Sequence, residues 1–94
     1  MKIIKLYGVE HCRVDGVQTY EVFRTLEEAK RFVEDKDNWD CNNVPLFIFF
    51  CDFDADCIYE EDDGMLNYDD CSTTMQGNFK MIREVNKKPV HFED

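Results

Sequence analysis

The segment from Val44 to Cys51 constrains the fold more than any other part of the chain, because it is apolar at every position. As an extended strand it would present apolar side chains on both faces, which is typical of a central strand covered on both sides. Pro45 stands near its start, where a missing N–H group is tolerated. The run is far shorter than the ~20 residues that a membrane-spanning helix needs. It therefore predicts a buried strand within a sheet.

Two strands and a helix are expected before this run. Ile3–His11 and Val17–Arg24 are rich in β-branched and aromatic residues, and the Asp15-Gly16 dipeptide between them favours a hairpin turn. The sequence Thr25-Leu26-Glu27-Glu28 fits a capping box, which marks the start of a helix. Apolar residues at helical spacing then predict a helix over about 26–36.

A β-meander is expected after the apolar run. Its elements are, in chain order, a turn at 52–56, a strand at 57–61, a turn at Asp63-Gly64 and a strand at 65–72, and a polar loop at 37–43 precedes the run. Phe79–Val85 suits a strand or a helix by its apolar spacing, and we favour a strand. Pro89 and the charged end of the chain favour a frayed tail at 87–94.

These elements predict one compact α+β domain over residues 1–94, without a linker that would divide it. We expect a mostly antiparallel sheet of five to six strands, built from a β-hairpin, a helix and a β-meander, with the helix packed on one face. The chain is 44% hydrophobic and 14% aromatic, which is enough for a core. The open edges of a small sheet also make a homodimer plausible.

The acidic residues are concentrated in one stretch of the chain. Between Asp37 and Phe79 there are eleven acidic residues and no Lys, Arg or His, whereas residues 1–36 sum to zero charge and residues 80–94 sum to +1. The net charge of −10 therefore arises in this stretch. Like charges without internal counter-charges destabilise a compact state, so a cation or a basic partner would stabilise it. The alternative is that the acids only keep an aromatic-rich domain soluble.

The cysteines and the N-terminus favour a cytoplasmic protein. The five cysteines form no C-x-x-C pair, so neither a disulfide framework nor a zinc ribbon is indicated, and reduced thiols fit better. Lys5 and Glu10 interrupt any apolar region of a signal peptide. We expect no cofactor and no membrane partner.

One local pattern resembles the start of a calcium-binding loop. Asp52, Asp54 and Asp56 have the spacing of the first EF-hand ligands, and Asp63 stands at the twelfth position. Cys57 replaces the glycine that the loop requires, and neither flank predicts a helix. A looser divalent-cation site at 52–63 is therefore one alternative, and a solvated acidic turn is another.

A second interpretation of the same acids is mimicry of nucleic-acid phosphates. Alternate residues on a strand place carboxylates ~6.5 to 7 Å apart. Duplex DNA carries one charge per ~1.7 Å of its axis, so a mimic needs several such rows side by side. The candidate partner-binding residues are Asp52, Asp54, Asp56, Glu60, Glu61, Asp62, Asp63, Asp69 and Asp70. Phe53, Tyr59 and Tyr68 are candidate interface anchors, although core packing is favoured for Phe53.

An enzyme is not predicted. The sequence contains no nucleophile elbow, Walker loop or zinc-protease motif, and the adjacent His11 and Cys12 would point to opposite faces of a strand. Direct binding of nucleic acid is also disfavoured, because the basic residues are interspersed with acidic ones. A nucleic-acid-binding protein as partner fits the charge, since its basic groove would attract an acidic surface.

In composition the chain is similar to small acidic inhibitors, many of them phage-encoded and including anti-CRISPR proteins, that occupy the nucleic-acid groove of a host defence enzyme. The resemblance covers no aligned stretch and transfers no functional residue. It implies a non-enzymatic inhibitor that binds the basic surface of a nuclease or another nucleic-acid-binding protein. The two other hypotheses are the divalent-cation domain and an ordinary interaction domain whose acids only aid solubility.

Overall fold

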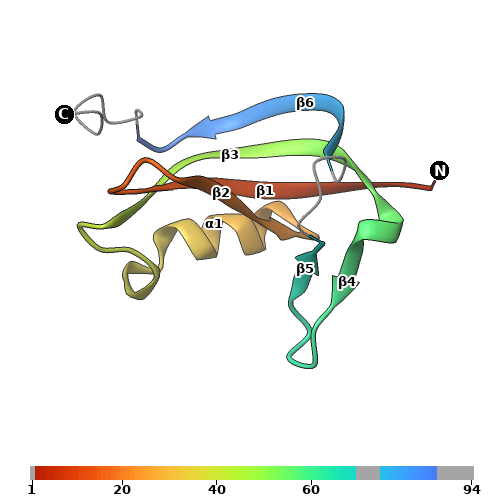
Figure 1. The fold of residues 1–94 in the computed structure, drawn as a ribbon, viewed down its shortest axis with the longest axis horizontal. Coiled ribbons are helices and arrows are strands. Elements are labelled where there is room, and N and C mark those ends of the chain that lie inside the picture. The colour runs from red at the N-terminus through yellow and green to blue at the C-terminus, as the bar shows by residue number, and fades with distance from the viewer. Residues whose placement is uncertain (1, 70–74, 87–94) are drawn as a thin grey trace.

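A computed structural model describes residues 2–69 and 75–86 of the 94-residue chain. Its main sheet has four antiparallel strands in the order β2-β1-β3-β6, and a separate two-stranded sheet pairs β4 with β5 (Figure 1). The strands are β1 (Ile3–Arg13), β2 (Gln18–Phe23), β3 (Asn43–Asp54), β4 (Ile58–Glu60), β5 (Leu66–Tyr68) and β6 (Met75–Glu84). One α-helix, α1 (Leu26–Glu34), lies between β2 and β3 in the chain. Within the described ranges, no helix is long and apolar enough to span a bilayer.

The predicted first hairpin is confirmed. β1 and β2 pair in an antiparallel register from Tyr7 opposite Phe23 to Cys12 opposite Gln18. Gly16 in the connecting turn has a φ of 87°, a conformation that a residue without Cβ adopts at little cost. The Asp15 side chain accepts a hydrogen bond from the Val17 backbone N–H at 3.1 Å, as expected of an Asx turn.

The helix also begins where the capping box predicts. The Thr25 hydroxyl accepts a hydrogen bond from the Glu28 N–H at 3.2 Å, and the Glu28 carboxylate accepts one from the Thr25 N–H at 3.1 Å. The helix ends at Glu34, earlier than the expected end near residue 36. The reason is Asp35, whose side chain accepts a hydrogen bond from the Asp37 N–H. This bond caps a short 3-10 helix, Lys36–Asn38, which follows α1 in place of a further α-helical turn.

The apolar run is confirmed as a central strand, β3, which pairs with β1 on one side and with β6 on the other. β3 is longer than expected and continues to Asp54, so the prediction of a turn beginning at Asp52 was wrong. Lys5 of β1 stands opposite Asp52, and this pairing extends the strand through the polar residue.

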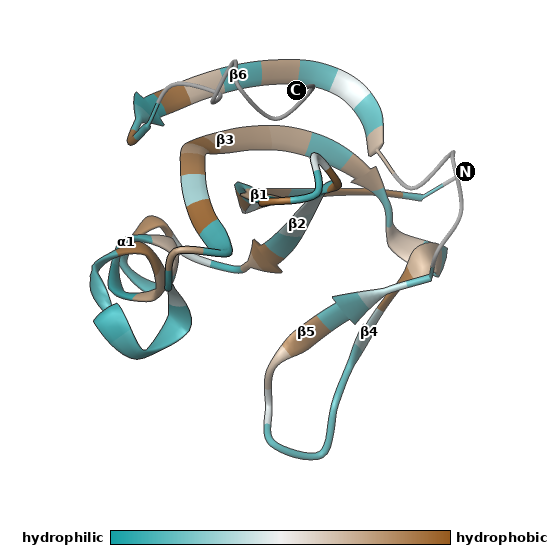
Figure 2. Cartoon of the chain, turned by 60° about the vertical axis from the view of Figure 1, so that its left-hand side comes forward, coloured by the Kyte–Doolittle hydropathy of each residue, from teal (hydrophilic) through white to brown (hydrophobic). Residues whose placement is uncertain are grey.

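The mostly antiparallel α+β fold with one helix is confirmed for the described residues, but the expected single sheet of five to six strands is wrong, because β4 and β5 form a hairpin outside the main sheet. The Asp54 side chain accepts from the Asp56 N–H at 3.0 Å and caps a 3-10 helix, Ala55–Cys57, that turns the chain away from β3. β6 takes the place beside β3 that the meander was expected to fill. The hairpin therefore projects from the body as a separate arm, with a hydrophilic turn at its tip (Figures 1 and 2).

The ambiguous segment Phe79–Val85 is a strand as far as Glu84, as favoured from the sequence. β6 begins at Met75, and its pairing with β3 is irregular near Gly77 and Asn78, whose φ angles are 141° and 53°. After the strand, the Val85 and Asn86 N–H groups both donate to the Leu46 carbonyl. The tail expected at 87–94 lies outside the described residues.

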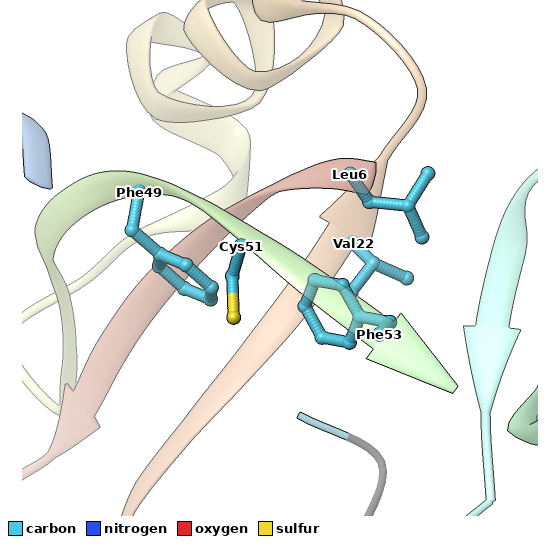
Figure 3. Close-up of a cluster of buried hydrophobic side chains, with 5 residues drawn as sticks. All are labelled: Leu6, Val22, Phe49, Cys51 and Phe53. Carbon is cyan, nitrogen blue, oxygen red and sulfur yellow. The ribbon is translucent and has the colours of Figure 1, made fainter. Parts of the chain in front are cut away.

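The core consists of two clusters that use alternate residues of the same strands. One cluster contains Phe49, Cys51 and Phe53 of β3 together with Leu6 and Val22, as Figure 3 shows. The other contains Val9, Phe23, Ala29, Val33 and Ile48 and joins the sheet to α1. Because neighbouring residues on a strand point to opposite faces, both faces of β3 are covered, as its apolar pattern required.

Candidate acidic binding site

The structure separates the predicted acids into two groups. Asp52 and Asp54 lie on β3, whereas Glu60, Glu61, Asp62 and Asp63 lie on the projecting β4–β5 hairpin. Asp56 is exposed in the 3-10 helix between the two groups, and Asp69 is exposed just after β5. Asp70 lies outside the described residues. The single row of carboxylates at 52, 54 and 56 is not formed, because the strand ends before Asp56.

Asp52 is neutralised within the protein. Its Oδ1 lies 2.8 Å from Lys5 Nζ and its Oδ2 accepts from Asn78 Nδ2 at 2.6 Å, and the side chain is only 13% exposed. Hydrogen bonds from Lys5 and Asn78 lower the pKa of the Asp52 carboxyl below its ordinary value. Asp52 thus joins β1, β3 and β6, and its contacts are those of a structural residue.

This arrangement predicts a pH-dependent effect of Asp52→Asn. A carboxyl whose pKa is lowered by folding stabilises the protein above its unfolded pKa, and the stabilisation is lost as the pH falls through the lower folded pKa. We therefore expect Asp52→Asn to reduce the free energy of unfolding at pH 7 and to have a smaller effect in strong acid. Urea unfolding of both proteins across this range measures the difference, and an effect that stays constant with pH would contradict the ion pair.

The hairpin acids are only partly engaged. Glu60 Oε2 lies 3.3 Å from Arg24 Nη2, the one ion pair of the 60–63 group in the described residues. Glu61 accepts from the Asn67 side-chain amide at 2.9 Å, and Asp63 accepts from the Met65 N–H at 2.9 Å. Both of these donors are neutral, and Asp62 is exposed. Glu61, Asp62 and Asp63 therefore present negative charge to solvent at the tip.

Two sets of contacts connect the projecting hairpin to β2 and to Arg24, which follows β2. At its base, the Tyr68 ring stacks on Tyr20 of β2 with ring centroids 4.4 Å apart, and the Tyr68 hydroxyl donates to the Tyr20 carbonyl at 2.7 Å. At its tip, Arg24 donates from Nη1 to the Gly64 carbonyl at 3.2 Å, in addition to its ion pair with Glu60. The position of the acidic tip is thus fixed by aromatic stacking and by Arg24.

A hollow beside the tip brings in an acid that the sequence did not indicate. It is lined by Glu21 of β2 together with Glu61, Asp62, Asp63, Met65, Leu66 and Asn67 of the hairpin. Glu21 lies in the part of the sequence whose charges balance, so nothing in the linear charge pattern marks it. Its Oε2 lies 3.5 Å from Nε2 of the buried His11, and its side chain is 47% exposed.

The aromatic residues proposed as anchors have different environments. Phe53 is fully buried in the core, which confirms the favoured role, and Tyr68 is occupied by its stacking on Tyr20. Tyr59 is 45% exposed on β4, so it alone of the three presents substantial apolar surface.

The acids of 52–63 do not converge on one point. Asp54 caps the 3-10 helix, Asp63 bonds to the hairpin turn, and Asp52 faces Lys5. Among the residues that the structure describes, no group of three or more His, Cys, Asp or Glu side chains is placed to hold a metal ion. No observation therefore favours the divalent-cation hypothesis over the binding of a partner protein.

Comparisons with known proteins give no match: no protein-family model, curated protein or solved structure matches the chain. What the protein binds is therefore inferred from its own side chains.

Proposed function

We propose that this protein is a non-enzymatic acidic binding protein that inhibits a partner by occupying its basic nucleic-acid-binding surface. The partner class is a nuclease or another nucleic-acid-binding protein, as in phage-encoded anti-defence inhibitors of the anti-CRISPR type. The proposed contact surface is the hairpin tip with Glu61, Asp62 and Asp63, joined by Glu21. Cytoplasmic location is part of this proposal, and a homodimer through an open edge of the sheet remains a prediction.

The observation that carries the proposal is a projecting arm whose acids face solvent. Of the acids predicted as candidates, Asp52 and Glu60 form ion pairs within the described residues. Glu61 and Asp63 accept hydrogen bonds from neutral groups, and Asp62 is exposed. Such an arm makes the local electrostatic potential more negative, and it attracts a positively charged surface over about 8 Å at physiological salt. Other exposed acids lie on α1, in the loops and on β6, but among the described residues three successive acids occur only at this tip.

The proposal is tested by affinity capture from a cell lysate at low and at moderate salt, with mass spectrometry to identify the captured proteins. We expect enrichment of a nucleic-acid-handling protein at low salt and a marked loss at moderate salt, because the contacts are between opposite charges. A captured set that lacks nucleic-acid-handling proteins, or one that is insensitive to salt, would contradict the proposal and favour an ordinary interaction domain.

A further inference from the structure

Two hollows that share Met65 lie beside the acidic hairpin; together they are called the groove here, and their linings identify the kind of segment that fits. One hollow, described above, lies between Glu21 of β2 and the hairpin tip. A second hollow is lined by Phe23 of β2, by Phe32 of α1 and by Met65 of the hairpin, with Glu28, Arg31, Asp35 and Asn38 around them. Met65 belongs to both hollows. Because Glu21 and Phe23 are alternate residues on one face of β2, the two hollows adjoin.

The groove has an apolar floor and acidic walls. Met65, which is 45% exposed, and the partly buried Phe32 supply the apolar surface, whereas Phe23 is only 4% exposed. Six acids line the two hollows, and Arg31 is the only cation among the residues that line them in the described structure. The acids are Glu21, Glu28, Asp35, Glu61, Asp62 and Asp63.

The groove exists before a partner binds, because its two sides are fixed independently. Glu28 and Asp35 belong to the capped helix and its 3-10 extension. On the other side, Arg24 holds the hairpin through Gly64 and Glu60. A preformed site loses less conformational entropy on binding than one that must be assembled.

We infer that this groove binds an extended basic segment of the partner in which Arg or Lys residues flank one large apolar side chain. The apolar side chain contacts Met65 and the aromatic floor, and the flanking cations face the acidic walls. This inference rests on the proposed function, and it adds that recognition depends on an apolar anchor as well as on charge. An uncharged apolar segment would leave the acids without counter-charges, and a purely basic one would leave the floor exposed to water.

Two labelled peptides that differ only in the anchor test this inference: Arg-Arg-Leu-Arg-Arg and Arg-Arg-Gly-Arg-Arg. Fluorescence anisotropy with the full chain is expected to show about tenfold tighter binding of the leucine peptide, since burying a leucine side chain on apolar surface is favourable by this order. In Met65→Ala the preference is expected to fall to about twofold or less, because the shared apolar contact is removed. In Arg31→Ala both peptides are expected to bind about threefold tighter, and Lys80→Ala is the matched control without effect, because β6 is the sheet edge opposite β2.

Equal binding of the two peptides to the wild-type chain would overturn the inference, as would a preference that Met65→Ala leaves intact while its melting curve matches the wild type. Binding of Ser-Ser-Leu-Ser-Ser as tightly as the basic leucine peptide would also overturn it, because the occupant would then be apolar only. Failure of both basic peptides to bind would overturn it as well. The proposed function fails separately, when no nucleic-acid-handling protein is captured from a lysate in a salt-sensitive way.

Discussion

Gly8→Ala is expected to destabilise the fold by about 3 kcal/mol, which is the upper end of the usual cost of overpacking a core. A Cβ at Gly8 would lie 2.2 Å from Cζ of Phe49 and within 2.8 Å of two further atoms of the same ring. That ring is fully buried and is packed against Phe53, Phe79 and Tyr20, so it has no free space into which to move. Urea unfolding followed by far-UV circular dichroism measures the loss.

The control is a double-mutant cycle with Phe49→Leu. Leucine lacks the distal ring atoms that the new methyl group would meet, so Phe49→Leu alone is expected to cost about 1 to 3 kcal/mol through the space that it leaves. The double variant is expected to lose less free energy of unfolding than the two single variants together, by about 1 kcal/mol or more. The reason is that leucine removes the ring atoms that the new methyl group would meet, and the methyl group fills part of the space that the ring leaves. Strictly additive losses would show that the ring does not lie over Gly8.

Reversing exposed acids of the proposed contact surface is expected to weaken partner binding by about 100-fold at low salt, given the energies of close charge pairs at interfaces. The variant combines Glu61→Lys and Asp62→Lys at the tip with Glu21→Lys on the adjoining β2, and it leaves Asp54 and Asp63 in place because these two bond to backbone N–H groups of the turns. Each change replaces a charge of −1 by one of +1, so the three changes take the net charge from −10 to −4. Titration of the captured partner measures the affinity and its dependence on salt.

The matched control changes the same number of charges elsewhere. Glu10→Lys, Asp15→Lys and Glu84→Lys also give −4, but these residues lie on β1, in the β1–β2 turn and on β6, and none of them lines either hollow. We expect less than about a threefold loss from this variant, because charges beyond a Debye length of the contact are screened. If both variants lose affinity equally, net charge rather than the arm determines binding.

The elements of the fold could be predicted where local chemistry decides them. The capping box at Thr25, the Asp15-Gly16 turn and the two-faced apolar run each specify a structure through neighbouring residues alone. The arrangement of β4 and β5 could not be predicted in this way, because it depends on a competition for the edge of β3. β6 pairs with that edge although it is distant from β3 in the sequence. The Asp54 cap turns the chain between them away from β3.

The candidate site was predictable only in part for the same reason. The linear charge pattern located Glu60 to Asp63, which are close in sequence and remain close in the hairpin. It gave no indication that Lys5 would neutralise Asp52 or that Arg24 would pair with Glu60, since both basic residues come from the balanced N-terminal part. Glu21, Glu28 and Asp35 join the site only because the tip of the hairpin lies beside β2 and α1.

The most direct test of the central claim is competition with nucleic acid for the captured partner. The wild-type protein is immobilised, the partner is bound at low salt, and duplex DNA or RNA is added at constant ionic strength while the released partner is quantified. If the acidic arm occupies the nucleic-acid-binding surface, the nucleic acid will displace the partner in proportion to its own affinity. A partner that binds nucleic acid and the immobilised protein at the same time would contradict the claim.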